Sequence, residues 1–477
     1  MISSPANCLL DKAWALGIGK LSVSSLPITH YQLPTSTNIQ VFKQNDMNHQ
    51  KIIVNYLKFA EKGLFILGLS FFSGIFSPES MGTILPEIFV SFIRFSLWGI
   101  FTFLIVLVWQ DAIAIINRNK ILFILSVLAY FSFIWSELPD YTLLNARDIW
   151  MMTTFALYFA IRFSFKEQIK IITYTLLIGM FMSFIFVYAF PGIGRHWVDH
   201  PGAWKGVYGH KNYLGSLMVL SSLAFLSLSK DSLLIYRWGG FALSLFFILL
   251  STSRTSLVLC FLLLSIISFY KNFRWQGKVS VIFLDLTILF LGCISLLVFT
   301  YWVELITGLG RDPTITGRTI IWEVALNRLM ERPFLGYGRG AFWAPKSNYA
   351  FEATQAIGTG WVPPHGHNGF IDTALDIGLI GLLLFFICYF RTFAKALKFG
   401  YASNKPEEIW PLAYLIFLII NNITESCLLY QPNIYWVLFI TIAFTLSNKS
   451  HYHTLGFQPP QSALLKQSQK KRKLITS

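Results

Sequence analysis

The chain has few charged residues. Asp, Glu, Lys and Arg make up 13% of its 477 residues, against about 25% in a soluble domain. By contrast, 55% of the residues are hydrophobic and the mean hydropathy is +0.57. This composition excludes a soluble domain and predicts a polytopic integral membrane protein. The net charge of +15 is spread over short loops and the C-terminal tail, which fits membrane topology and anionic headgroups, so nucleic acid is not an expected partner.

Metal and cofactor signals are also lacking. No two of the five cysteines have the spacing of metal ligands, and three lie in hydrophobic runs, so they indicate small apolar side chains without a disulfide framework: Cys8, Cys260, Cys293, Cys388 and Cys427. The chain has no Asp-x-Asp element, no dense carboxylate cluster in its outward loops and no nucleotide-binding loop. A metal-dependent transferase that uses a nucleotide sugar is therefore disfavoured, and neither a metal nor a cofactor is expected.

Hydrophobic runs long enough to cross a bilayer number about twelve, which predicts an all-α fold. They are placed near 63–78, 86–109, 119–136, 146–164, 168–190, 211–229, 233–251, 254–270, 279–303, 368–391, 408–424 and 429–447. Alternate loops are rich in Lys and Arg, so the positive-inside rule makes them cytoplasmic and places both termini inside. We expect a cytoplasmic segment 1–60 without regular structure, nine helices over 61–303, a large outward loop over 304–367 with amphipathic helices, three more helices over 368–448, and a basic cytoplasmic tail over 449–477.

The first fifty residues have no signal-peptide pattern, and Met47 is a second candidate for the start of translation. This topology puts every unusual polar cluster on the outward face. The clusters are 204–212, 251–256, 311–318 and 365–368, with Glu425 between the last two spans. Extra cations in outward loops oppose the topological rule, so they indicate an anionic ligand there. For the long loop the alternative is that long loops escape the rule.

Two histidines, His365 and His367, lie where the large loop meets a membrane helix, and Asn368 after them is a good helix N-cap. A titratable side chain at the positive end of a helix dipole is well placed to act on an anionic, lipid-carried substrate. The alternative is a polar turn that only leads into a helix.

Two arginines are candidates for binding that anion. Arg254 lies in a short run of Ser and Thr between hydrophobic segments, where it either lines a cavity or extends to the outer headgroups. Arg318 lies in the first turn of an amphipathic helix predicted from Thr316 or Gly317 to about Leu329, with its apolar face at Ile320, Ile321, Val324, Leu326 and Leu329. The helix dipole disfavours a cation there unless an anion also binds, and a guanidinium suits phosphate. An exposed loop arginine is the alternative.

The segment 206–215 repeats the pattern of a His, an Asn and then a helix, with His210 and Lys211 at its centre. Two helix starts that face the same side could jointly bind an anion. The glycine-rich run 336–340 around Arg339 has no preceding strand, so a dinucleotide site fails on context and a flexible turn beneath Phe342 and Trp343 is favoured.

Three elements together resemble the O-antigen ligase and O-antigen polymerase superfamily. They are Ser253-Arg254, Gly317-Arg318 with Trp322, and the run from His367-Asn368-Gly369-Phe370 to Gly378 and Gly381. The segment 206–212 is similar to the exopolysaccharide-polymerase branch, and the resemblance covers roughly 190–390.

The resemblance implies a GT-C-like enzyme of the bacterial inner membrane that needs no metal. Such an enzyme transfers a glycan from undecaprenyl diphosphate, at the periplasmic face, to an acceptor glycan or lipid. It implies His367 as the essential histidine and Arg254 and Arg318 as the diphosphate ligands. Supporting roles fall to His365, Asn368, His210, Lys211, Arg339 and Glu425. Membrane lipids and polysaccharide export proteins are the further partners expected.

Two other functions stay open. A transporter of an anion or of the lipid-linked glycan would also be polytopic with arginines in its membrane region, although here the charges gather at one face. A non-catalytic partner of an export complex would need neither the histidines nor the arginines. The sequence does not distinguish a polymerase from a ligase.

Overall fold

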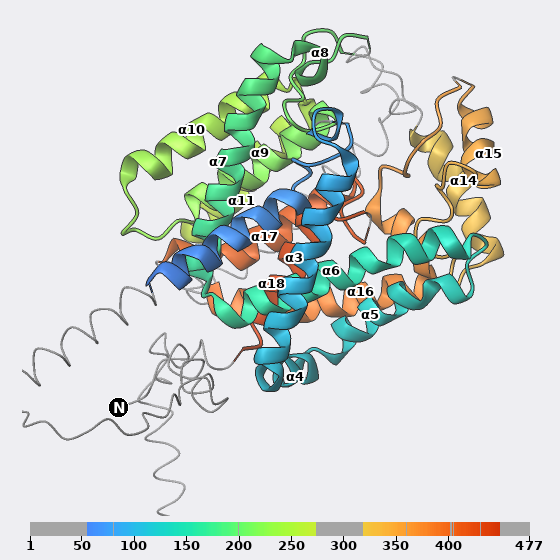
Figure 1. Ribbon diagram of the computed structural model, residues 1–477. Helices are drawn as coiled ribbons and strands as arrows, with labels where there is room; N and C mark the ends of the chain where they lie inside the picture. Colours follow the sequence, from blue (N-terminus) through green and yellow to red (C-terminus); the bar gives the residue numbers. More distant parts are fainter. Residues whose placement is uncertain are drawn as a thin grey trace, which may run out of the picture. The chain divides into compact units, whose positions relative to one another are not determined.

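The computed structural model describes residues 55–272 except 80 and 199, and residues 318–448 except 359, 401, 402, 404 and 430. The chain divides into one unit up to Ala60 and another from Glu61 onward, and the second unit contains every element from η1 to α18. In these ranges every regular element is a helix, which confirms the expected all-α fold, and the one β-bridge joins Arg195 to Trp204 (Figure 1).

A first helix ends at residue 72. The elements after it are η1 (Met81–Thr83), α3 (Glu87–Leu107), α4 (Trp109–Arg118), α5 (Lys120–Phe131), η2 (Ser132–Ile134), α6 (Pro139–Arg162), α7 (Phe165–Ala189), α8 (Pro191–Gly194), α9 (Lys211–Leu226), α10 (Leu234–Leu250), α11 (Arg254–Asn272), α14 (Arg318–Glu331), α15 (Asn348–Ile357), α16 (Gly369–Gly400), α17 (Pro406–Asn422) and α18 (Ile434–Thr445).

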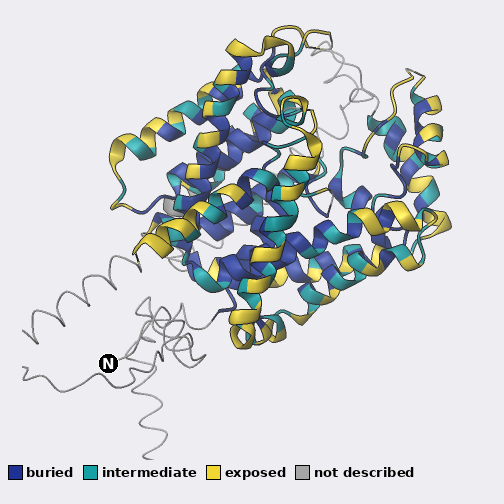
Figure 2. Ribbon diagram, viewed as in Figure 1, coloured by how far each residue is buried: buried dark blue, intermediate teal, exposed yellow. Residues whose placement is uncertain are grey.

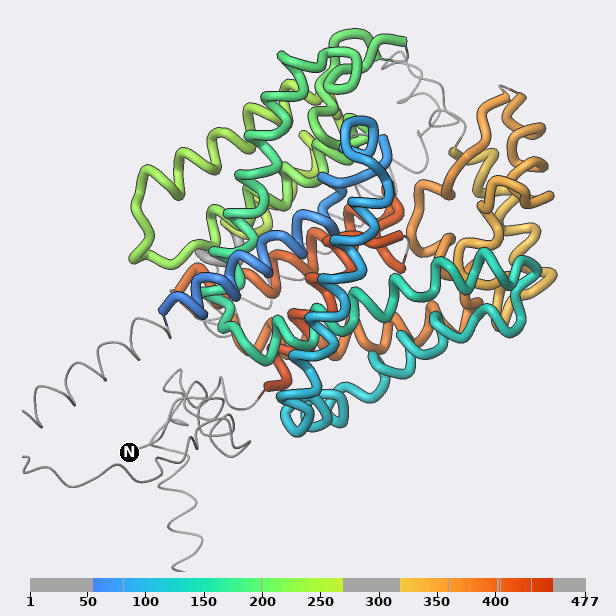
Figure 3. Tube along the Cα trace, in the orientation of Figure 1, coloured from blue at the N-terminus to red at the C-terminus, as the bar shows by residue number. Residues whose placement is uncertain are grey.

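The core of the second unit is formed by the helices that other helices surround. Every residue of α18 is buried, and α9 is buried from Leu214 to Phe225 (Figure 2). Helix α9 packs against α7, α10, α11 and α17, while α6 packs against α3, α5 and α18. Figure 3 shows α9 (green) beside α17 (orange), although about 180 residues of sequence separate them. Polar groups carried on α9 and at the end of α17 are therefore brought close together.

The described helices are those of a membrane protein. Three of them, α3, α7 and α16, are long and apolar enough to cross a bilayer, and α4 with α5 would make a fourth as a pair bent by 97°. Helices α10 and α18 are apolar but shorter. Most of these helices fall within a few residues of the predicted spans, while α4 was not predicted. The span expected at 279–303 lies outside the described residues, so the number twelve stays a prediction.

Helix α16 is broken, which corrects the single span predicted at 368–391. Ile377 and Gly378 have non-helical backbone angles, and Gly378 has a φ of +71°. The break frees backbone groups, and the segment 333–338 pairs with them: the N–H of Tyr337 donates to the carbonyl of Leu375 (2.7 Å), and the N–H of Leu379 donates to that of Pro333 (2.7 Å). A Cβ at Gly378 would lie 1.9 Å from the Phe334 carbonyl oxygen, so only glycine fits.

The segment from α14 to α15 forms a second, smaller core. Helix α14 buries Ile321, Ala325 and Leu329, which are spaced by four residues, against α15 and α16. The predicted apolar face was partly wrong, because Leu326 is 47% exposed and Ala325 takes its place in the core. This segment is joined to the α5–α6 turn, where Arg332 pairs with Glu137 at 2.5 Å.

Candidate functional site

The half-helix 369–376, which ends at the break in α16, carries the histidine pair at its N-terminus. As predicted, Asn368 caps this helix, because its side-chain oxygen accepts hydrogen bonds from the N–H groups of Phe370 (3.0 Å) and Ile371 (3.3 Å). His367 has a φ of +51°, an uncommon conformation for a residue with a side chain. Its N–H donates to Nδ1 of His365 (3.1 Å), and the two rings lie 4.2 Å apart. The two imidazoles therefore form one compact group.

Asp372 holds this turn in place, and the sequence analysis did not single it out. It is only 3% exposed and lies one turn into the half-helix. One carboxylate oxygen accepts from the N–H of Gly366 (2.9 Å) and from the indole of Trp343 (2.8 Å), and the other accepts from the Ser426 hydroxyl. That hydroxyl also lies 3.3 Å from Nδ1 of His365. Asp372 is therefore a positioning residue for the histidine turn.

The turn is also tied to α14 and so to Arg318. The indole N–H of Trp322 donates to the carbonyl of Gly366 at 2.7 Å. Arg318 begins α14, and one of its NH groups donates to the carbonyl of Thr424 (2.9 Å), while another lies 3.7 Å from a carboxylate oxygen of Glu425. The side chains of Arg318 and Glu425 are 14% and 19% exposed. Arg318 is thus held largely out of solvent, between α14 and the loop that follows α17.

Glu425 connects Arg318 to the start of α9. The Asn212 side chain hydrogen-bonds to the Glu425 carboxylate, and its amide oxygen accepts from the Ser253 hydroxyl at 3.1 Å. Ser253 precedes Arg254, which begins α11 with an exposed side chain. Across the described ranges Arg254 makes neither a hydrogen bond nor an ion pair. The structure therefore brings the Ser253 end of α11 to the Arg318 group, while Arg254 itself is free to meet a ligand.

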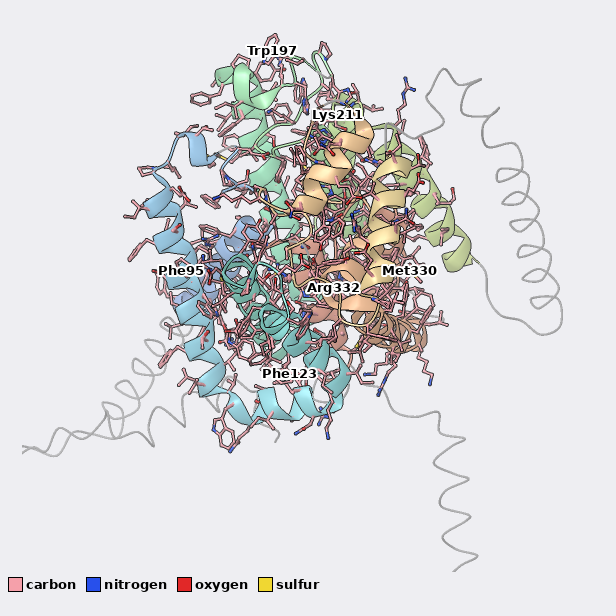
Figure 4. All side chains as sticks on the ribbon, turned by 90° about the vertical axis from the view of Figure 1, so that its right-hand side faces the viewer. Phe95, Phe123, Trp197, Lys211, Met330 and Arg332 are labelled. Carbon is pink, nitrogen blue, oxygen red and sulfur yellow. The ribbon has the colours of Figure 1, made fainter. Side chains whose placement is uncertain are left out.

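His210 lies at the other predicted helix start and belongs to a second histidine group. It caps α9, since its Nδ1 accepts from the N–H of Asn212 at 3.2 Å. Its ring lies 5.0 Å from that of His196 and 6.2 Å from that of His200, and Nε2 of His196 accepts from the N–H of Lys211 at 3.1 Å. Figure 4 labels Lys211 at this helix start. Sequence reasoning missed His196 and His200, although all three histidines lie in one predicted loop.

Electrostatics show that the two histidine groups lie near the same arginine. Burial lowers the pKa of His365 to about 3 and that of His210 to about 4, and the nearby charge of Arg318 adds to both shifts. Burial also lowers the pKa of His367 to about 2, with smaller effects from His365, Arg318 and His210. All three imidazoles are therefore neutral at pH 7. For His367, as for the other two, burial is the largest cause.

For the Arg318–Glu425 pair, the cost of burial exceeds the ionic attraction. Burial raises the pKa of Glu425 to about 7, although Arg318 and the Asn212 hydrogen bond both lower it. Burial also lowers the pKa of Arg318, which Glu425 raises in part. Both shifts disfavour the charged forms, so removal from water outweighs the mutual attraction at 3.7 Å. Arg318 therefore has a counter-ion that an incoming anion can replace.

Arg339, predicted as a supporting residue, is buried and bonded to three other segments of the fold. It is 2% exposed, its Nε donates to the carbonyl of Leu429 (2.8 Å), and another of its NH groups donates to that of Asn145. Its backbone N–H donates to Ser132 at 3.0 Å. These bonds join the glycine-rich turn to α6, to η2 and to the loop before α18. Arg339 therefore braces the fold around the glycine-rich turn.

Within the described residues, no three His, Cys, Asp or Glu side chains are arranged to hold a metal ion. The described cysteines Cys260, Cys388 and Cys427 are free and buried. The groups that the structure brings together are thus the Arg318 guanidinium and neutral imidazoles near one carboxyl group, with hydroxyl and amide side chains beside them. Such a set can bind a phosphate and position a hydroxyl group beside it.

Comparison with known proteins gives a consistent result. A family profile described as O-antigen ligase matches residues 239–386, the range that contains Arg254, Arg318, His365 and His367. The chain is 30% identical to "Exopolysaccharide production protein ExoQ" of Rhizobium meliloti over 114 residues, which are 24% of this chain and 26% of that protein. It is 32% identical to a "Putative polysaccharide ligase" of Rickettsia felis over 98 residues, which are 20% and 24% of the two chains.

These matches span about a quarter of the length of the relatives. They agree with the family profile on the kind of protein, and the described helices agree with a membrane location. Residues 239–386 thus match the O-antigen ligase family, and the chain is similar over part of its length to proteins named for exopolysaccharide production and polysaccharide ligation.

Proposed function

We propose that this protein is a membrane glycosyltransferase that moves a glycan from undecaprenyl diphosphate to an acceptor sugar at the periplasmic face of the inner membrane. The observation that carries the proposal is the position of Arg318. Its guanidinium lies beside Glu425, which hydrogen-bonds to Asn212 at the start of α9, and its helix α14 is bonded to the histidine turn through Trp322. A cation among neutral imidazoles suits a reaction between an anion and a hydroxyl group.

Arg318 is proposed to bind the diphosphate and to stabilise the charge that grows on it as the glycosidic bond breaks. Two of its NH groups now face the Thr424 carbonyl and the Glu425 carboxyl group. A phosphate oxygen would replace the carboxyl group, and the fork of the guanidinium can bond two such oxygens. Arg254, exposed beside Ser253, is proposed to close over the same diphosphate from α11.

His367 is proposed to accept a hydrogen bond from the hydroxyl group of the acceptor sugar. Its Nδ1 is buried without a hydrogen-bond partner, so this nitrogen can accept from a hydroxyl group when the ring is neutral with its proton on Nε2. A pKa of about 2 makes the free imidazole a weak base. The bound diphosphate would offset the charge of Arg318 and raise that pKa, so the histidine gains basicity only when the donor is present. A single displacement would invert the anomeric carbon.

Glu425 offers a second base. Its pKa of about 7 matches the pH of the reaction, where a general base works best. As diphosphate replaces it beside Arg318, the carboxyl group would take up a proton or turn toward the acceptor. His367 nevertheless remains the proposed catalytic group. It lies in the run 367–370 that carries the family resemblance, and hydrogen bonds fix its turn at the N-terminus of the half-helix.

The test compares membranes of a host that lacks this protein with membranes of the same host carrying its variants. His367→Ala and Arg318→Lys should both let the lipid-linked glycan accumulate, as in the deletion, at normal protein levels. Arg328→Lys is the matched control, since Arg328 is also on α14 but pairs with Glu331 and Glu352 at the surface. Near-normal polymer or ligated product from His367→Ala would overturn the catalytic assignment.

The proposed orientation has its own test. The described cysteines are buried, so they give little background to an impermeant thiol reagent. A cysteine introduced at Asn348, which begins α15, should react from outside the cell, and one at Ser403, between α16 and α17, should not. The reverse labelling would place the Arg318 group on the cytoplasmic side and exclude a periplasmic reaction.

A further inference from the structure

A groove over the first half of α6 lies apart from the histidine turns. It has a volume of about 500 Å³ and is lined by Tyr130 of α5 and by Asp140, Leu143, Leu144 and Arg147 of α6. The α6 residues follow the spacing of one helix face, so α6 forms the floor of the groove. Leu143 and Leu144 are 45% and 55% exposed. Helices α5 and α3 both pack against α6 and so border this floor.

Arg147, which lines the groove, and Arg94 meet at one aromatic ring. Arg94 of α3 and Arg147 of α6 both face the ring of Phe95, with guanidinium carbons 5.2 and 5.1 Å from its centre. Figure 4 labels Phe95 on α3. Within the described part of the chain neither arginine forms a hydrogen bond or an ion pair, and Nε of Arg94 is buried without a partner. Polar groups buried in this way are costly unless a ligand pairs with them.

The nearby carboxylates do not balance the positive charge of the two arginines. Asp148 is buried within electrostatic range of both arginines, but it also interacts with the buried Arg339 and lies beyond ion-pair distance of all three. Asp140, which also lines the groove, is exposed, so water screens it. The two arginines therefore keep an excess of positive charge at Phe95, and the ligand that matches it is an anion.

The surroundings of the two arginines suit a lipid as the ligand. Phe95 of α3 contacts Arg147 of α6, and further along Phe101 contacts Phe155, so the two helices run in the same direction. Arg94 lies seven residues from the N-terminal end of α3, and Arg147 lies eight residues from that of α6. That is about 10–12 Å along each helix at 1.5 Å per residue. Only 11% of the apolar stretch of α3 is buried, and Ile88, Phe89 and Phe92 are exposed on it. A hydrocarbon chain would therefore lie next to the cations.

We propose that this groove binds a lipid through its phosphate group, with Arg94 and Arg147 as the phosphate ligands. The hydrocarbon chain lies along the exposed apolar face of α3, and Tyr130 and Leu144 border the headgroup. Anionic phospholipids and polyprenyl phosphates share this chemistry. If the lipid is a polyprenyl phosphate, the groove holds the lipid carrier of a second, glycan-bearing substrate, and that identification rests on the proposed transferase function.

Binding is tested with the full chain in nanodiscs of phosphatidylcholine, to which undecaprenyl phosphate or phosphatidylglycerol is added. Bound lipid is counted by native mass spectrometry. The double variant Arg94→Gln/Arg147→Gln should bind at least about tenfold more weakly, because each arginine supplies charge-assisted hydrogen bonds. Arg328→Gln is the control for loss of a surface arginine. Equal binding by the double variant and the wild type would overturn the proposal.

A steric variant covers the case in which the double variant does not fold. Leu144→Trp keeps both arginines but fills the groove, so it should displace the lipid at an unchanged melting temperature, whereas Leu234→Trp, at an exposed position of α10, should not. A folded Leu144→Trp protein that keeps its lipid would refute the site. Preference for undecaprenyl phosphate identifies a site for a polyprenyl carrier, and equal binding of both lipids identifies a phospholipid site. Arg318→Gln should lose transfer and keep this lipid, which separates the two proposals.

Discussion

Replacing Glu425 with glutamine should stabilise the protein at alkaline pH. Burial raises the pKa of this carboxyl group to about 7 in the folded protein, whereas an unfolded chain has the ordinary value of 4.5. The folded state therefore binds the proton more tightly than the unfolded state does. The contribution of Glu425 to stability is present in full below pH 4.5 and is lost as the pH rises through 7.

The size of the effect can be worked from the same two values. The difference between about 7 and 4.5 corresponds to about 3 kcal/mol of unfolding free energy above pH 7. The Glu425 side chain is 19% exposed, so solvent screens little of it. Glutamine resembles the protonated acid and keeps the hydrogen bond to Asn212. The variant should thus differ little from the wild type at pH 4.5 and be more stable at pH 8, by a few degrees in melting temperature, roughly 3 °C.

The assay is thermal unfolding of the purified protein in detergent, followed by intrinsic fluorescence between pH 4.5 and 8.5. Glu331→Gln serves as the matched control, because Glu331 is an exposed carboxylate paired with an arginine at the surface. The wild type and the control should lose stability together as the pH rises, while Glu425→Gln should lose less. Parallel curves for all three proteins would show that Glu425 is ionised freely in the fold, and the description of the Arg318 counter-ion would then be wrong.

Three further predictions concern the histidine turn and the helix break. His367→Ala should abolish transfer and leave donor retention in membranes and the melting temperature nearly unchanged; weakened retention of donor would instead make the histidine a binding group. Asp372→Ala removes the acceptor of three hydrogen bonds and should lower both activity and the melting temperature. Asp372→Asn keeps an oxygen that can accept two of these hydrogen bonds, so it should recover much of the stability. An equal loss of activity and stability in the two variants would exclude a positioning role. Gly378→Ala should lower the free energy of unfolding by about 3 kcal/mol or more, because φ is +71° and a carbonyl oxygen would lie 1.9 Å from the new Cβ. The control is Gly99→Ala on α3, where the new Cβ meets open space, and it should leave the melting temperature unchanged.

Much of the fold was predictable because it depends on local composition. Long apolar runs placed most of the helices within a few residues of their observed bounds, and the Asn368 cap was predicted from its position before an apolar run. Likewise, Arg318 was expected in the first turn of a helix, and it begins α14. Periodicity was less reliable for the face of α14, since Leu326 is exposed where Ala325 packs.

The candidate site was predictable only in part. The residue types pointed to His365, His367 and Arg318 one by one, and the shared face suggested that they meet. The groups that hold them could not be found in this way. Asp372 lies inside an apolar helix and Ser426 in a short loop, and nothing local distinguishes them from residues of the core. Their role arises because the loop after α17 folds back onto the start of α16.

By itself, the sequence determined that this is an all-α membrane protein with polar clusters at the ends of its apolar helices. Hydrophobicity and helix capping act over neighbouring residues, so they can be read along the chain. Tertiary structure alone decided that α16 breaks at Gly378, that Arg339 braces the fold, and that Arg94 and Arg147 meet at the ring of Phe95. Each of these depends on a backbone or side chain from a distant segment, because an unpaired carbonyl or guanidinium takes its partner from whatever the fold brings near.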